Sequence, residues 1–76
     1  MARLPRLTAI ELIQAIEKVG FVYSRSRGSH QIFYNPTTGK RTTIPFHRKK
    51  IIPPGTLLNI LREAGIERDQ LETLIK

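Results

Sequence analysis

The sequence predicts an α+β domain in which one helix is followed by three antiparallel strands and a second helix, with a short extra helix at the end. Apolar residues recur at helical spacing towards both ends of the 76-residue chain. The middle third instead carries short runs of β-forming residues that are separated by turn formers. Residues that cap and stop helices mark the boundaries between these parts.

The first helix is predicted over residues 9–19. Thr8 and Glu11 have the spacing of a capping box, in which the hydroxyl accepts a hydrogen bond from the third helical amide and the carboxylate bonds back to the capping residue. Leu12 and Ile16 follow at helical spacing, and Gly20 supplies the stop.

The strands are predicted over residues 21–26, 29–34 and 41–46. Arg27-Gly28 is typical of a tight turn between the first two, and residues 35–40 form a hairpin loop that is dense in turn formers. Pro45 cannot donate a ladder hydrogen bond, so the third strand is expected to lie at a sheet edge or to end there.

The second long helix is predicted to start in Pro53-Pro54-Gly55-Thr56 and to end at Gly65, with a last short helix over residues 68–75. A three-stranded antiparallel sheet with helices on one face leaves its other face in water. That architecture is double-stranded-RNA-binding-domain-like, and such domains read A-form RNA by shape and backbone. We expect one domain, residues 1–76, which is too small for a deep enclosed site.

The composition excludes several classes of protein. With no cysteine there is no disulfide scaffold, no thiolate nucleophile and no thiolate-ligated zinc site. No signal-peptide-like segment is expected in residues 1–8, and no apolar run approaches the ~20 residues that cross a bilayer. We therefore expect a cytoplasmic protein without a membrane role.

The positive charge is concentrated in the middle of the chain, whose formal net charge is +7. Residues 19–50 contain no acid, and their basic residues are Arg25, Arg27, Lys40, Arg41, Arg48, Lys49 and Lys50. Such segregation is typical of a polyanion binder, whereas a basic face kept only for solubility would normally intersperse both signs. Because no carboxylate lies between Glu17 and Glu63, we expect no hard-metal cage and no cofactor.

The two histidines are the candidates for acid–base chemistry, since imidazole is the side-chain group whose ordinary pKa lies near neutrality. RNA cleavage needs a base for the 2′-hydroxyl proton, an acid for the leaving oxygen and cations for the phosphorane charge. His30 follows a glycine turn and two arginines, although a lone strand histidine is more often structural. His47 fits a surface histidine or a phosphate contact equally well. The Ser29 hydroxyl is expected to bond the local backbone more readily than to act as a nucleophile.

Four aromatic residues of the strand region fit either base stacking or packing: Tyr23, Phe33, Tyr34 and Phe46. At strand spacing, packing is the more frequent role. Alternation puts His30 in phase with Ile32 and Tyr34, and Gln31 in phase with Phe33. Neither face is cleanly apolar, so the residues alone leave open which one points inward.

Several motifs in order carry a resemblance to a known family. They are Gly20-Phe21, Arg25-x-x-Gly28-Ser29-His30-x-Ile32-Phe33, Ile44-Pro45-x-His47, and Ile52-x-x-Gly55-Thr56-Leu57-x-x-Ile60-Leu61-x-x-Ala64-Gly65-Ile66. Together they resemble the HicA toxins of bacterial and archaeal toxin–antitoxin pairs, over residues 8–74. The residues before the first helix and the last helix are the departures.

The resemblance implies a double-stranded-RNA-binding-like fold, cleavage of messenger RNA with arrest of translation, and His30 as the catalytic residue of the Gly-Ser-His element. It also implies a HicB-type antitoxin that covers the active surface. We expect a monomeric free toxin, with a higher oligomer left open for the antitoxin complex.

The resulting hypothesis is a metal-independent endoribonuclease. His30 takes the 2′-hydroxyl proton, while His47 or water supplies the acid. The residues expected to contact RNA are Arg25, Arg27, Ser29, Lys40, Arg41, Arg48, Lys49 and Lys50. Of these, Arg25, Arg27 and the Lys40-Arg41 pair are expected to steady the scissile phosphate, and Arg48, Lys49 and Lys50 to extend the positive track. The alternatives are an RNA-binding module that only occupies RNA, with His30 in packing or phosphate contact, and a DNA-binding module.

Overall fold

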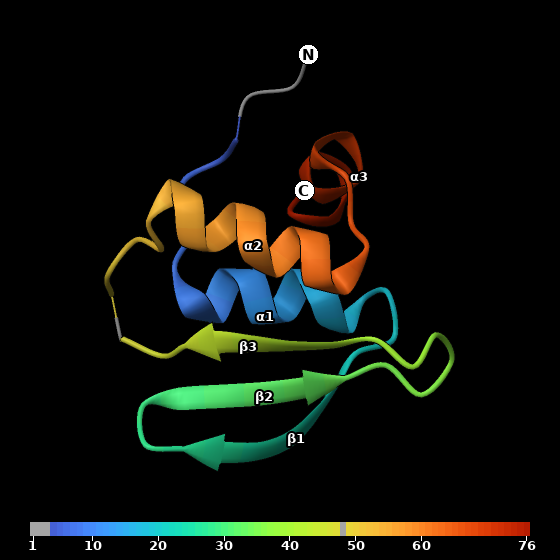
Figure 1. The fold of residues 1–76 in the computed structure, drawn as a ribbon. Coiled ribbons are helices and arrows are strands. Elements are labelled where there is room, and N and C mark those ends of the chain that lie inside the picture. The colour runs from blue at the N-terminus through green and yellow to red at the C-terminus, as the bar shows by residue number, and fades with distance from the viewer. Residues whose placement is uncertain (1–3, 48) are drawn as a thin grey trace.

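The predicted order of elements is confirmed by the structure, a computed structural model that describes residues 4–47 and 49–76 (Figure 1). The elements are α1 (Ala9–Glu17), β1 (Val22–Arg27), β2 (His30–Tyr34), β3 (Arg41–Pro45), α2 (Pro54–Ala64) and α3 (Arg68–Leu74). The predicted boundaries differ from these by one or two residues. Within the described ranges, none of the helices combines the length and apolar character needed to span a membrane.

The sheet is antiparallel with strand order β1-β2-β3, and the helices lie on one side of it (Figure 1). Both α1 and α2 contact β3. β1 is the edge strand farthest from the helices, and all six of its residues are exposed. One face of the sheet is therefore open to solvent, as predicted for this fold class.

The start of α1 is the predicted capping box. The Thr8 amide donates to Glu11 Oε1 over 2.9 Å, and the Glu11 amide donates to Thr8 Oγ1 over 3.3 Å. The helix ends two residues before the predicted position because the chain tightens there: the Lys18 and Val19 amides donate to carbonyls three residues back. Gly20 then takes a φ of +103°, which a side-chain-bearing residue rarely adopts.

The core is built from the apolar faces of the helices and from the inner residues of β2 and β3. Phe33 and Ile44 are buried on the helix side of the sheet, and the Phe33 ring meets Tyr23 edge-on with ring centroids 5.9 Å apart. Phe46 packs against the same core from the end of β3. Buried Thr42 donates its hydroxyl hydrogen bond to Glu63 Oε1 at 2.9 Å, which ties β3 to α2 and satisfies the polar group.

Asn35 joins the hairpin between β2 and β3 to the end of α1. Its side chain is buried, donates to the Val19 carbonyl over 3.0 Å and accepts from the Thr37 amide over 2.9 Å. It also lies directly against Gly20, where a Cβ would come within 3.4 Å of the Asn35 amide. The end of α1 and the hairpin are thus held in one arrangement, which sets how the helices sit on the sheet.

Candidate nucleic-acid interface

The solvent-facing side of the sheet carries His30 and three of the basic residues that the sequence singled out. Directly opposed residues on neighbouring strands share a face, so the register defines this side. Its three cross-strand rows, which we call the open face, are Arg27–His30–Pro45, Arg25–Ile32–Thr43 and Val22–Tyr34–Arg41. The opposite face carries the buried pair Phe33 and Thr42. The structure therefore shows which face of the strands points towards the core, a question that the residue pattern had left open.

A β-bulge in β1 brings two arginines to this side. Tyr23 lies opposite Phe33, but the next paired residue is Arg25, opposite Ile32, because the register shifts at Ser24. A regular strand would place Arg25 opposite Gln31 and turn its side chain to the helix side. The extra residue reverses the phase of the strand that follows it. As a result Arg25 and Arg27 share a face with His30.

His30 begins β2 at one end of the open face. It follows the turn at Gly28, whose φ is +59°, and its imidazole is exposed. Arg27 is its neighbour on β1 and Pro45 its neighbour on β3. Opposed residues of an antiparallel pair are ~5 Å apart at Cα, so a guanidinium accompanies the imidazole on an accessible surface. Ser29 is exposed beside it, with its carbonyl accepting from the Phe46 amide at 2.6 Å.

The basic segment after β3 continues from the same end of the sheet. His47 is exposed, lies two residues beyond Pro45, and lines a small hollow of about 140 Å³ with Ile51 and Ile52 among its walls. Lys49 and Lys50 are exposed, and the Lys50 amide donates to the His47 carbonyl at 3.2 Å. The predicted contact residue Arg48 lies outside the described residues. The described lysines extend the positive surface beyond the end at which His30 lies.

Lys40 and Arg41 lie at the other end of the sheet. Arg41 is opposite Tyr34, four residues along β2 from His30, or ~13 Å at 3.3 Å per residue. The Lys40 side chain packs at the end of α2, where a Cβ at Gly65 would lie 2.9 Å from Lys40 Cε. The expectation that this pair steadies the phosphate at His30 is therefore wrong, because the hairpin that joins the strands carries both residues away from that end.

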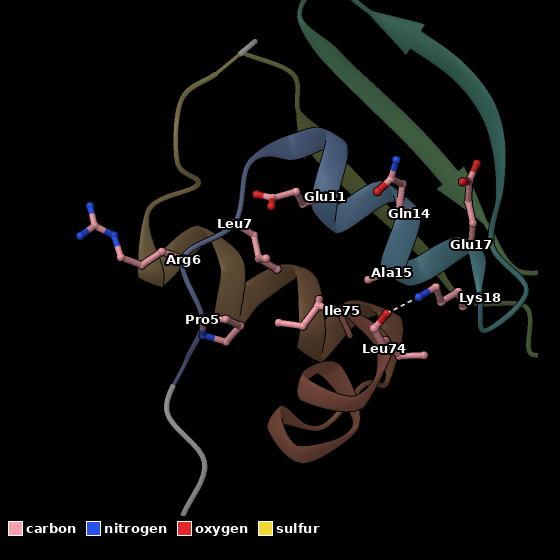
Figure 2. A pocket seen from close by; sticks show the side chains of 10 residues that line it. All are labelled: Pro5, Arg6, Leu7, Glu11, Gln14, Ala15, Glu17, Lys18, Leu74 and Ile75. Carbon is pink, nitrogen blue, oxygen red and sulfur yellow. Dashed lines mark hydrogen bonds between the residues drawn. The ribbon is translucent and has the colours of Figure 1, made fainter.

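A larger hollow, of about 690 Å³, lies between the N-terminal segment, α1 and α3 (Figure 2). Lys18 Nζ donates to the Leu74 carbonyl across one end of it. Its walls mix both signs of charge, including Arg6, Glu11 and Glu17, and it belongs to the helix layer. Such a lining does not favour a polyanion, so the open face remains the candidate for nucleic acid. Within residues 4–47 and 49–76, no three acidic or histidine side chains gather closely enough to hold a metal ion.

The position of Arg25 and Arg27 on the open face can be tested by substituting each of them. We expect Arg25→Gln and Arg27→Gln each to weaken RNA binding and to lower the slope of log affinity against log salt by ~0.7, the value for one phosphate contact on a single strand. Fluorescence anisotropy with a labelled oligoribonucleotide over a salt series measures this slope. Arg62→Gln on the exposed side of α2 is the charge-matched control, and an equal loss in that variant would show that only net charge matters.

Comparison with known protein families shows to which family the chain belongs. The family model described as the HicA toxin of bacterial toxin–antitoxin matches residues 10–66, which is well over half of the sequence and includes all three strands and α2. The chain belongs to the HicA toxin family. The resemblance drawn from the motifs is thereby confirmed, although the match ends before α3. A comparison with curated proteins gives no match.

Membership places this HicA protein among the toxins of toxin–antitoxin systems, and such a system implies an antitoxin as its partner. The matched range contains His30, Arg25 and Arg27, and it also contains the β-bulge in β1. The sequence did not reveal the β-bulge at Ser24, which turns the residues after it to the other face of the sheet. A serine between Tyr23 and Arg25 looks like any other strand position.

Proposed function

We propose that this HicA toxin is a metal-independent endoribonuclease that cleaves messenger RNA, with His30 as its catalytic residue. The observation that supports the proposal is the exposed imidazole of His30 in one row with Arg27 on the open face. The nine residues of this face include three arginines and no carboxylate. A base and phosphate-binding cations are therefore side by side on a surface that an RNA strand can reach.

The chemistry follows from this arrangement. His30 accepts the proton of the 2′-hydroxyl, whose oxygen attacks the adjacent phosphorus and forms a 2′,3′-cyclic phosphate. The bond to the 5′-oxygen breaks, and that oxygen takes a proton from water or from His47. Arg27 stabilises the charge on the phosphorane, and Arg25 contacts the next phosphate along the strand.

The remaining predicted contacts are assigned to the ends of the RNA path. Ser29 contacts the phosphate beside His30, while Lys49 and Lys50 continue the path beyond β3; Arg48 stays a contact predicted from the sequence. Arg41 and Lys40 act at the opposite end. The antitoxin, of the HicB type, inhibits by covering the open face, so that RNA and antitoxin compete for it.

The test is a cleavage assay combined with expression in a bacterial host. We expect growth arrest with fragmented transcripts, and cleavage of a purified RNA that continues in the presence of a chelator. An oligonucleotide whose reacting 2′-hydroxyl is replaced by hydrogen should stay intact, because it lacks the nucleophile. Growth arrest with intact transcripts would instead indicate a protein that only occupies RNA.

A further inference from the structure

The end of the open face remote from His30 carries an aromatic residue and a cation in contact. The Arg41 guanidinium carbon lies 4.8 Å from the centroid of the Tyr34 ring. Arg41 is exposed and Tyr34 is half-buried, so the pair is anchored in the sheet and accessible from solvent. A guanidinium held over an aromatic ring is planar and ordered, and such planes stack on nucleobases.

The spacing of the rows gives the distance of the Tyr34–Arg41 pair from His30. Successive rows of the open face are two residues apart, which is ~6.6 Å along a strand. This step is comparable to the distance between successive phosphates of an extended single strand. Each row contributes one arginine: Arg27 beside His30, Arg25 beside Ile32, and Arg41 beside Tyr34. An RNA strand lying along β2 thus meets one arginine at each step.

We propose that Tyr34 and Arg41 form a base-stacking subsite, which takes the base two nucleotides away from the bond that His30 cleaves. The occupant is an unpaired base of a single-stranded RNA. In a duplex the faces of the bases are covered by their neighbours, whereas a single strand can turn a base onto the pair. The row between the two sites carries half-buried Ile32 and exposed Thr43, with no aromatic ring, so stacking is confined to the far row.

The position of the subsite, two nucleotides from the cleaved bond, rests on the proposed function. The stacking of a base on Tyr34 and Arg41 does not depend on cleavage. The first experiment therefore measures binding alone, with the intact protein and a short single-stranded oligonucleotide in 2′-deoxy form, compared with the same backbone made wholly abasic. The wild type should prefer the strand with bases by about tenfold, as expected for one stacked base. Tyr34→Leu and Arg41→Gln should remove most of that preference, whereas Tyr34→Phe keeps the ring and should retain it.

The second experiment fixes the position. A strand with one ribonucleotide among 2′-deoxy residues defines the only bond that can react through a 2′-hydroxyl, and a single abasic residue is then moved along it. We expect KM to rise about tenfold when the abasic residue is two steps from the ribonucleotide on one side, with kcat unchanged, and Tyr34→Leu to remove this dependence.

The outcomes separate the two proposals. Equal sensitivity to abasic residues at every position, or an unchanged base preference in Tyr34→Leu, would overturn the subsite. A failure to cleave while Tyr34→Leu still abolishes the base preference would overturn the enzyme and leave the subsite standing. Thermal unfolding of each variant shows whether a substitution, in particular at half-buried Tyr34, has destabilised the fold. Exposed Arg41 supplies the variant that leaves the packing intact, and Arg62→Gln is its charge-matched control.

Discussion

His30→Ala is expected to lose RNA cleavage by about 10²- to 10⁴-fold, which is the usual contribution of a positioned acid or base. The fold should be unaffected, because the imidazole is exposed at the first position of β2 and contributes nothing to the buried core. The affinity for RNA should change little, since Arg25, Arg27 and Arg41 stay on the open face. Single-turnover cleavage of a labelled oligoribonucleotide, with anisotropy on its uncleavable 2′-deoxy form, measures the two quantities separately.

His30→Gln is the sharper companion variant, because it keeps a hydrogen-bonding side chain of similar reach and removes only the imidazole ring. Expression of both variants should relieve growth arrest and leave transcripts intact. If His30→Ala still arrested growth while an Arg25→Gln and Arg27→Gln double variant did not, the arginines alone would carry toxicity. The protein would then act by occupying RNA.

Phe33→Ala is expected to cost about 3–5 kcal/mol of the free energy of unfolding, through lost burial and the cavity left behind. Phe33 is 2% exposed, is the fourth of the five residues of β2 and packs against the Tyr23 ring. Domains of this size have a total stability of only ~4–11 kcal/mol, so the variant should be largely unfolded under mild denaturation. Urea unfolding followed by circular dichroism measures the change.

Phe33→Leu is the matched control, because it keeps most of the apolar volume and should cost much less. His30 is three positions away on the same strand but on the opposite face, so a folded Phe33→Leu protein should still cleave RNA. A Phe33→Ala protein as stable as the wild type would mean that the buried face of β2 has been misassigned.

The elements themselves could be predicted because their signals are local. The capping box at Thr8, the turn at Gly28 and the stop at Gly65 each depend on a few adjacent residues, and the structure reproduces them. His30 could be singled out for the same reason, since the glycine turn and the arginines around it are close in sequence. These positions needed no knowledge of the rest of the fold.

The face of each strand residue could not be predicted in the same way. β1 has no apolar alternation because both of its faces are exposed, and the bulge at Ser24 inverts the phase without any residue type that marks it. The Lys40-Arg41 pair was misplaced for a related reason. Adjacent basic residues suggested a joint contact, but strand direction and hairpin connection put them at the end remote from His30.

The bulged edge strand has a consequence for how copies of the protein meet. An exposed sheet edge is a ready template for the strand of another molecule, and it is the usual origin of edge-to-edge aggregation. In β1 the irregularity at Ser24 breaks the straight row of backbone groups that an incoming strand would need. Arg25 and Arg27 add repulsion between any two copies that approach there. The strand that carries Arg25 and Arg27 therefore also discourages copies of the toxin from joining edge to edge.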